Sequence, residues 1–314
     1  MLRYALATLA LFAILIPGAR AADAESTDSL PRYRFSPGQK LFYETRSEGK
    51  NRSSTTVNTG TLELIVLKTE PDGAWRIFSR TASAYRQMRG DGEEYVSPER
   101  VSMEFFRIYP DGRIVLDEPG PNKPSFNYSL PVLPADAAQA AQGWTLDLGG
   151  PFATKIEYSP DMAASKPGHF VIKANFKGTD DAIYKSSMQQ WYDFDLGRGL
   201  VVAKRNETSQ GNDGTGKSEG FATLTQAMQT EPAELEKLTI ESEAYQRAVK
   251  DYSMLLEQVE TDAAAAPAIL SRAVQTLRDA KSGLTLPLLV ADIDQRIAAH
   301  DESVQSMVKN AQWR

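Results

Sequence analysis

The sequence predicts an α+β fold, in which a long-stranded, curved antiparallel sheet or half-barrel is followed by a C-terminal three-helix region. Three observations lead to this prediction. Apolar and polar residues alternate from about Tyr33 to Met228, and turn motifs separate the alternating stretches. From Glu231 onward, the apolar residues recur every three or four positions instead, as on a helix.

The alternation is clearest in residues 170–176, where Phe170, Ile172, Ala174 and Phe176 share one face and the other face is mostly polar. Residues 62–67 also alternate, but there Ile65 and Leu67 make the second face partly apolar. Residues 74–86 are rich in aromatic and β-branched residues and contain no Gly or Pro. Each stretch is typical of a strand.

Turn motifs separate these strands. The sequence Pro-Asp-Gly occurs at 71–73 and 110–112 and suits a type I turn followed by a left-handed glycine. Reversals are also expected at Asp91–Gly92 and Gly197–Gly199. This spacing indicates an antiparallel meander, and strands of this length coil, which favours a curved sheet. Residues 134–143 predict one short helix, which begins with Pro and ends at Gly.

Three helices are expected after residue 230. The first carries an apolar seam along its length, the second lies between Pro267 and Gly283, and the third carries another seam. The seam of the first comprises Leu235, Leu238, Ser242, Tyr245, Val249, Tyr252, Leu256 and Val259, and that of the third comprises Leu286, Val290, Ile293, Ile297, His300, Val304, Met307 and Ala311. We therefore expect a β domain over 22–230 and a helical bundle or hairpin over 231–314. The alternative is that the helices pack on the sheet as part of one domain.

Residues 1–21 have the features of a secretory signal peptide. Arg3 precedes an apolar run from Tyr4 to Ile16, and residues 19–21 form a small-x-small cleavage site. The run is shorter than the roughly 20 residues that span a bilayer. We expect cleavage after Ala21 and a periplasmic or secreted protein without an integral membrane segment.

Composition excludes several classes of function. The chain has no cysteine, so it has no disulfide, thiolate zinc site, Cys nucleophile or lipidated cysteine. The whole chain has 35 basic and 41 acidic residues, and an acidic balance disfavours a nucleic-acid partner or an anionic-membrane patch.

The octapeptide GNDGTGKS (Gly211–Ser218) matches the phosphate-loop pattern G-x-x-x-x-G-K-[ST]. A working phosphate loop needs a helix that starts at its Lys-Ser, so that backbone N–H groups point at the phosphates. Here Gly220 and two threonines follow, and they favour a strand. We therefore predict a hairpin loop that binds no nucleotide.

The other candidate sites are weaker. Asp193 and Asp195 begin a D-x-D-x-G pattern, but an EF-hand needs Gly at position six and Glu at position twelve, where Arg198 and Lys204 stand. A strand end that turns at Gly197 is expected, with a looser calcium site as the alternative. Carboxylates for glycoside hydrolysis would come from acidic pairs, namely Asp180 with Asp181, Asp193 with Asp195, and Glu93 with Glu94. Turn and surface positions are the simpler interpretation of these pairs.

The two histidines do not indicate catalysis. His169 lies on the polar side of its strand, and His300 lies in the seam of the last helix, where packing is expected. No G-x-S-x-G nucleophile elbow is present. The sequence therefore predicts no catalytic residue, no metal site and no cofactor.

The aromatic residues of the β region are expected to form its core, and some of them to line a cavity for an apolar ligand. They are Trp75, Phe78, Tyr85, Phe105, Phe106, Phe126, Tyr128, Trp144, Phe152, Phe170, Phe176, Trp191 and Phe194.

Two stretches, YRFSPGQKLFY (33–43) and WYDFDLGRGL (191–200), together with Gly143–Trp144, carry a resemblance. The chain resembles exported bacterial β-rich modules of unknown function that precede a helical linker and a thioredoxin-like domain. This resemblance implies a non-catalytic partner module of the cell envelope. The chain ends at Arg314, about where the thioredoxin-like domain would begin, and it lacks the cysteines of such a domain.

These observations predict an exported, non-catalytic binding or scaffolding protein that acts as a protein-interaction module, with the helix seams as its docking surface. The alternative is a carrier that holds a lipid or another apolar ligand in the concave face of the sheet. A carboxylate hydrolase is a third hypothesis.

Overall fold

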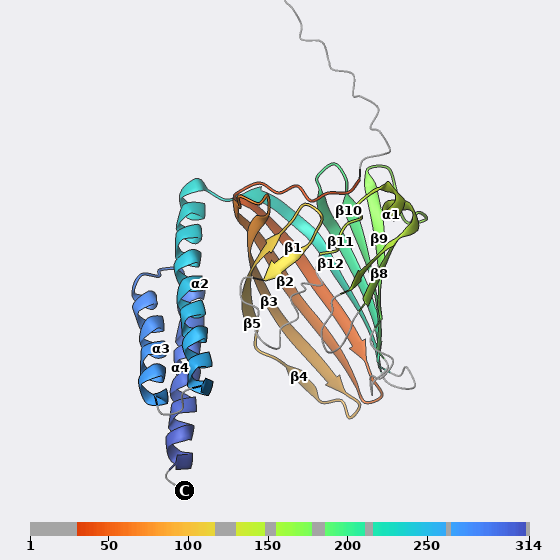
Figure 1. Cartoon of the computed structure of the whole chain (residues 1–314). Coiled ribbons are helices and arrows are strands. Elements are labelled where there is room, and N and C mark those ends of the chain that lie inside the picture. Colours follow the sequence, from red (N-terminus) through yellow and green to blue (C-terminus); the bar gives the residue numbers. More distant parts are fainter. Residues whose placement is uncertain are drawn as a thin grey trace, which may run out of the picture.

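The structure, a computed structural model, describes residues 30–116, 130–147, 155–177, 186–210, 216–261 and 265–311. The predicted signal peptide lies outside these residues. Twelve strands form one antiparallel sheet, and three long helices follow it (Figure 1). The sheet is curved and does not close into a barrel. The predicted fold class is confirmed.

The strands pair in the order β6-β5-β3-β2-β1-β12-β11-β10-β9-β8-β7, and β4 pairs with β3. Their bounds are β1 (Gln39–Lys50), β2 (Ser54–Thr69), β3 (Trp75–Arg89), β4 (Glu94–Val96), β5 (Arg100–Ile108), β6 (Ile114–Leu116), β7 (Trp144–Asp147), β8 (Lys155–Pro160), β9 (His169–Lys177), β10 (Ser186–Asp195), β11 (Leu200–Gln210) and β12 (Gly216–Gln229).

The central strands are long, and their coiling curves the sheet. β2 has 16 residues and β3 has 15, well above the usual five or six. One core cluster joins Phe106 of β5 to Trp144 of β7, near opposite ends of the strand order. Residues on strands so far apart in the sheet can contact one another only across its concave face, so this cluster defines the concave, inner face.

The predicted turns are present. Gly73 and Gly112 adopt φ values of 83° and 82°, in the left-handed region that favours glycine. The predicted short helix is α1 (Ala137–Gln142), and it starts later than expected. Its N-cap is Asp136, whose side chain accepts a hydrogen bond from the Gln139 N–H, so the cap and not Pro134 sets the start.

The three C-terminal helices are α2 (Pro232–Thr261), α3 (Ala266–Ser282) and α4 (Pro287–Ala311). They stand beside the part of the sheet that contains β2, β3 and β5, on its outer face (Figure 1). Ile65 and Leu67 of β2 share a core cluster with Tyr245 and Val249 of α2. The second apolar face of residues 62–67 is therefore the surface that the helices cover.

This packing corrects one expectation. The helix seams were predicted to offer a docking surface for a partner. In the structure, Tyr245 and Val249 are buried against the sheet and the neighbouring helices, and Ile293 of α4 is fully buried. The buried members of the seams therefore stabilise the protein itself and are not available for docking.

Candidate functional site

The inner face of the central strands β1 and β2 is apolar at one end and polar at the other. On β1, the inward residues run Leu41, Tyr43, Thr45 and Ser47, and on β2 they run Val66, Leu64, Leu62, Gly60 and Asn58. Because β1 and β2 are in register, the apolar ends lie side by side and so do the polar ends. The hollow of the sheet thus has an apolar half and a polar half.

The apolar half is packed by the protein's own side chains. Tyr33 stacks on Phe35 at 5.6 Å between ring centroids and meets Phe194 edge-on at 5.3 Å. Trp144 stacks on Tyr158 at 5.3 Å. All but Phe35 of these rings are buried. An apolar ligand would have to displace this core, so the apolar half is not its site.

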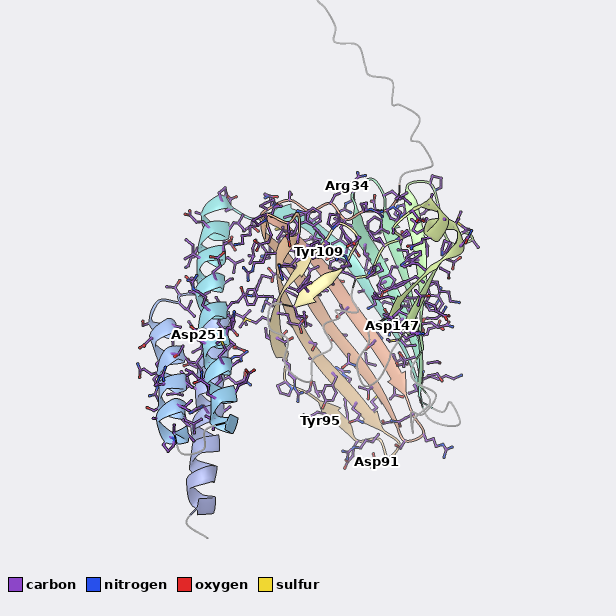
Figure 2. All side chains as sticks on the ribbon, viewed as in Figure 1. Arg34, Asp91, Tyr95, Tyr109, Asp147 and Asp251 are labelled. Carbon is purple, nitrogen blue, oxygen red and sulfur yellow. The ribbon has the colours of Figure 1, made fainter. Side chains whose placement is uncertain are left out.

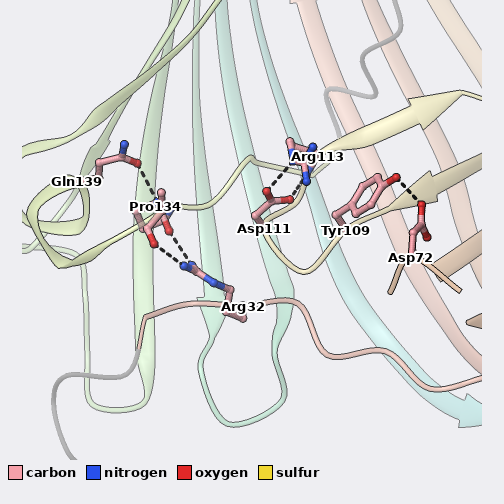
Figure 3. Close-up of polar contacts among 8 residues, drawn as sticks. Arg32, Asp72, Tyr109, Asp111, Arg113, Pro134 and Gln139 are labelled. Carbon is pink, nitrogen blue, oxygen red and sulfur yellow. Dashed lines mark hydrogen bonds and ion pairs between the residues drawn. The ribbon is translucent and has the colours of Figure 1, made fainter. Parts of the chain in front are cut away.

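The N-terminal segment 30–36 lies across the same end of the sheet. The Arg32 guanidinium donates to the carbonyl oxygens of Pro134 at 2.6 Å and Ala135 at 2.8 Å (Figure 3). The Tyr33 N–H donates to the Pro110 carbonyl. Arg34 and Tyr109 both lie at this end of the molecule, whereas Asp91 and Tyr95 lie at the opposite end (Figure 2). The segment therefore contacts several of the turns at the apolar end of the sheet and connects them.

A pocket of about 190 Å³ lies next to this core, where the apolar and polar halves meet. The Tyr43 hydroxyl is fixed at its wall, because it donates to the Val201 carbonyl at 2.8 Å. Gly220 leaves room for Asn206, since a Cβ at Gly220 would lie 2.4 Å from the Asn206 Oδ1. The inward residues that line the pocket are Tyr43, Thr45, Ser47, Asn58, Leu62, Ser83, Leu130, Val201, Lys204, Asn206, Gly220 and Ala222.

Lys204 reaches the inner face because of a β-bulge. Phe194 pairs with Val201 and Asp193 with Ala203, so Val202 is an extra residue on β11. Strict alternation from Val201 would turn Lys204 outward, but the extra residue reverses this. Lys204 therefore pairs with Tyr192 on the inner face, with its Nζ 5.5 Å from the centre of the Tyr192 ring. Burial lowers the pKa of Lys204 to about 8.

A second cavity, of about 610 Å³, lies on the outer face of β1, β10, β11 and β12. Ion pairs join several of the charged side chains at and beside this cavity. The Arg205 guanidinium contacts Glu207 at 2.5 Å and Glu219 at 2.8 Å, and Lys50 contacts Glu48 at 2.9 Å. These ion pairs are partly solvated, so each contributes little to stability.

The octapeptide GNDGTGKS ends in a strand, as predicted. β12 begins at Gly216, and Lys217 pairs antiparallel with Ser209 of β11 and Lys50 of β1. No helix starts at Lys217, so the segment after the loop has no helix N-terminus to bind phosphate. Gly216, Lys217 and Ser218 line a polar cavity of about 260 Å³ at the end of these strands.

The remaining candidate residues serve the fold. Asp193 lies 2.5 Å from His169 Nδ1, and Asp195 accepts a hydrogen bond from the Arg198 N–H in the turn between β10 and β11. The Asp195–Arg198 hydrogen bond confirms the prediction that the strand ends near Asp195 and the chain turns at Gly197. His300 is buried and lies against Tyr252, as expected for a packing role.

The acidic pairs that the structure describes, Glu93 with Glu94 and Asp193 with Asp195, do not line the inner pocket. Glu93 and Glu94 pair with Arg89 and Arg86 at an exposed hairpin. Asp180 and Asp181 lie outside the described residues. Among the described residues, no group of three His, Asp or Glu side chains is placed to hold a metal ion. Within the same part of the chain, no helix has the length and apolar character needed to cross a membrane.

The aromatic residues did not identify the pocket. Of the aromatic side chains singled out from the sequence, none of those that the structure describes lines it, and Phe126, Tyr128 and Phe152 lie outside the described residues. The pocket is lined mostly by small and polar residues. One usable signal is the change from apolar to polar inward residues within a single strand, such as Leu41 and Tyr43 followed by Thr45 and Ser47.

No protein-family model and no curated protein matches the chain. Several solved structures are similar to it, and two of them illustrate the likeness. A structure titled for lipid–protein interactions in lipovitellin has 12% sequence identity and a TM-score of 0.42, with 78% of this chain and 34% of that chain covered. The chain thus spans about a third of that protein's length. A lipoprotein candidate from Parabacteroides distasonis ATCC 8503 has 10% identity and a TM-score of 0.23, with 62% and 97% covered. Likenesses at this level do not assign a function.

Proposed function

We propose that the protein is an exported, non-catalytic binding protein that carries a small molecule in the inner pocket. One observation carries this proposal. The inner face has a packed apolar core at one end and, beside it, a pocket lined by hydroxyl, amide and ammonium groups. Folding alone gains little from polar side chains that face inward, whereas a ligand can use them as hydrogen-bond partners.

Two further points complete the proposal. Export follows from the signal-peptide features of residues 1–21. A non-catalytic role fits the surroundings of the His169–Asp193 pair, which resembles half of a catalytic triad. The nearby Ser165 hydroxyl donates to the Asp161 carbonyl and accepts from the Val171 N–H, so it belongs to the turn.

A pair of variants on one strand tests the proposal. Ala222 lines the pocket, and Thr223 is exposed on the opposite face of β12. Native mass spectrometry of gently purified protein should show a bound small molecule. Ala222→Phe should remove it by filling the pocket, and Thr223→Phe should retain it. A ligand that survives Ala222→Phe in a folded protein would place the binding site elsewhere.

A protein-interaction role is the second candidate, and the outer cavity favours it. Phe221 borders that cavity and is 47% exposed, so its ring is available for contact with a partner. Envelope pull-downs with the native chain should then recover a partner that Phe221→Ser loses. If both proteins recover the same partners, this face is not the interface.

A further inference from the structure

Inward polar side chains form a row across four strands at one wall of the inner pocket. In register, Asn58 of β2 pairs with Ser47 of β1, Ser47 with Gly220 of β12, and Gly220 with Asn206 of β11. Side chains paired in this way lie next to one another on one face of a sheet. The row therefore brings two amide groups and one hydroxyl group together at the pocket.

Gly220 leaves a gap in this row, and the Asn206 side chain occupies it. A Cβ at Gly220 would lie 2.4 Å from the Asn206 Oδ1 and 3.2 Å from the Asn206 Nδ2. The Asn206 amide group therefore lies over the backbone of β12 and leans toward β1. A side chain at position 220 would displace this amide group from the wall of the pocket.

The neutral polar groups of the pocket keep hydrogen-bonding capacity for a ligand. Among the described residues, none donates a hydrogen bond to the side chains of Thr45, Ser83 and Asn206 or accepts one from them. Asn58 Nδ2 donates to Ser47 Oγ at 3.2 Å, which leaves the Asn58 carbonyl oxygen and the Ser47 hydroxyl proton available. All five side chains are at least partly exposed, so a ligand can reach them.

These amide and hydroxyl groups share one chemical property, because each of them both donates and accepts hydrogen bonds. The hydroxyl groups of a ligand do the same, whereas a carboxylate only accepts and an ammonium group only donates. Lys204 also lines the pocket, but its Nζ lies 5.5 Å from the centre of the Tyr192 ring and Lys204 has a further interaction within the protein. Recognition of a cargo therefore falls to the neutral groups.

The size and the apolar side of the pocket limit the shape of the cargo. The volume of about 190 Å³ is below the roughly 300–1,000 Å³ of sites for drug-sized ligands, so a single small ring is the expected size. Leu62 and Leu130 give the pocket an apolar side, against which the C–H groups of such a ring can pack.

We infer that the inner pocket binds a small neutral polyol with one ring, of the size of a monosaccharide or a cyclitol. Its hydroxyl groups hydrogen-bond to Asn206, Asn58 and Thr45, and its C–H groups contact the apolar side. This inference rests on the proposed carrier function and adds the chemical class of the cargo. Asn206 is its specificity-determining residue, because one amide group can donate to one hydroxyl group of the ring and accept from the next.

Probes with the same six-membered ring test the class of ligand. Glucose, galactose, mannose and myo-inositol would be titrated into the mature chain after removal of any co-purified molecule, with calorimetry or NMR as the readout. Cyclohexanol, cyclohexanecarboxylate and cyclohexylamine are the comparison compounds. At least one polyol should bind at least tenfold more tightly than each of them, since it makes several more hydrogen bonds. A polyol that binds no better than cyclohexanol, or more weakly than either charged ring, would refute the inference.

The preferred sugar could be free or the terminal residue of a longer glycan. Its methyl glycoside separates these two sources. Retained affinity indicates a terminal residue, and lost affinity indicates the free ring.

Two threonines provide a matched pair of variants. Thr45 faces inward on β1 and lines the pocket, whereas Thr223 is exposed on the outer face of the neighbouring β12. Replacement by Val removes one hydroxyl group and keeps the branched shape. Thr45→Val should weaken binding of the preferred polyol roughly threefold to tenfold, as expected for one neutral hydrogen bond, and Thr223→Val should change nothing. Equal affinities of the two variants would contradict a role for Thr45.

Asn206 is tested by removal and by displacement of its amide group. Asn206→Leu should weaken polyol binding at least tenfold, because it removes a donor and an acceptor together. Gly220→Ala keeps the amide group but forces it out of the gap, so it should weaken binding as well. Should Asn206→Leu fail to fold, Gly220→Ala and Thr45→Val decide the question. Unchanged polyol binding in the folded variants would overturn the inference.

The two proposals fail in different ways. If a molecule that is not a polyol co-purifies and is lost in Ala222→Phe, the carrier function stands and the polyol inference falls. If neither a co-purified molecule nor any probe binds, both fall.

Discussion

Replacement of Lys204 by Met should stabilise the protein at neutral pH. The side chain keeps its length and loses an ammonium group that burial disfavours. The difference between the ordinary pKa of 10.5 and a pKa of about 8 corresponds to about 3 kcal/mol at pH 7. Because Lys204 keeps part of its surface in solvent, screening reduces this value, and we expect a gain of about 1–2 kcal/mol in the free energy of unfolding.

The pH dependence distinguishes this cause from a general packing effect. The pKa of Lys204 is lower in the folded chain than in the unfolded chain. Between about pH 8 and 10.5 the unfolded chain therefore binds more protons, and the stability of the native protein rises with pH. The Met variant lacks this rise, so the gap between the two proteins should shrink over the same interval.

Urea unfolding of ligand-free protein at pH 7 and pH 9.5 measures both effects. Lys217→Met is the matched control, because Lys217 is exposed and its loss should leave stability within about 0.5 kcal/mol of native. A Lys204→Met protein that is less stable than native at pH 7 would refute the argument. A stability gap that stays constant up to pH 9.5 would refute it as well.

Two further predictions concern the fold, and a third concerns nucleotide binding. Gly112→Ala should destabilise the protein by about 1–3 kcal/mol more than Gly73→Ala does, as measured by thermal unfolding. Both glycines have positive φ. However, a Cβ at Gly112 would lie 2.3 Å from the Pro131 carbonyl oxygen, whereas a Cβ at Gly73 would meet open space. Burial opposes ionisation of Glu241, but hydrogen bonds from residues 285 and 286 outweigh it and lower its pKa. Glu241→Gln should therefore destabilise the protein at pH 7 by about 1–2 kcal/mol in urea unfolding, and the loss should fade as pH drops through the folded-state pKa. Calorimetric titration with Mg-ATP should give no binding heat, since Lys217 lies in a strand; saturable heat that Lys217→Ala abolishes would contradict this.

Local signals in the sequence were sufficient for much of the fold. The residues after Ser218 favour a strand by their own propensity, and the structure has β12 there. The Pro-Asp-Gly turns depend only on residues next to one another, so they too were predictable. The partly apolar second face of β2, with Ile65 and Leu67, was a visible sign that something covers the outer face.

The pocket was not predictable from local signals, because it depends on register across several strands. Thr45, Ser83 and Ala222 come from β1, β3 and β12, and nothing in the sequence near any one of them shows that they meet. The inward position of Lys204 was harder still to predict. Alternation counted from Val201 assigns it to the outer face, and only the extra residue in the ladder turns it inward.

The division of the central strands β1 and β2 into an apolar and a polar half has a consequence for evolution. The residues that hold the sheet together and those that would recognise cargo lie on the same strands but at different positions. Substitutions in the polar half remove little buried hydrocarbon, so they should be tolerated more often than substitutions in the core. Such a scaffold can acquire a new specificity without first losing its architecture, which makes the polar half the natural target for libraries that seek new ligands.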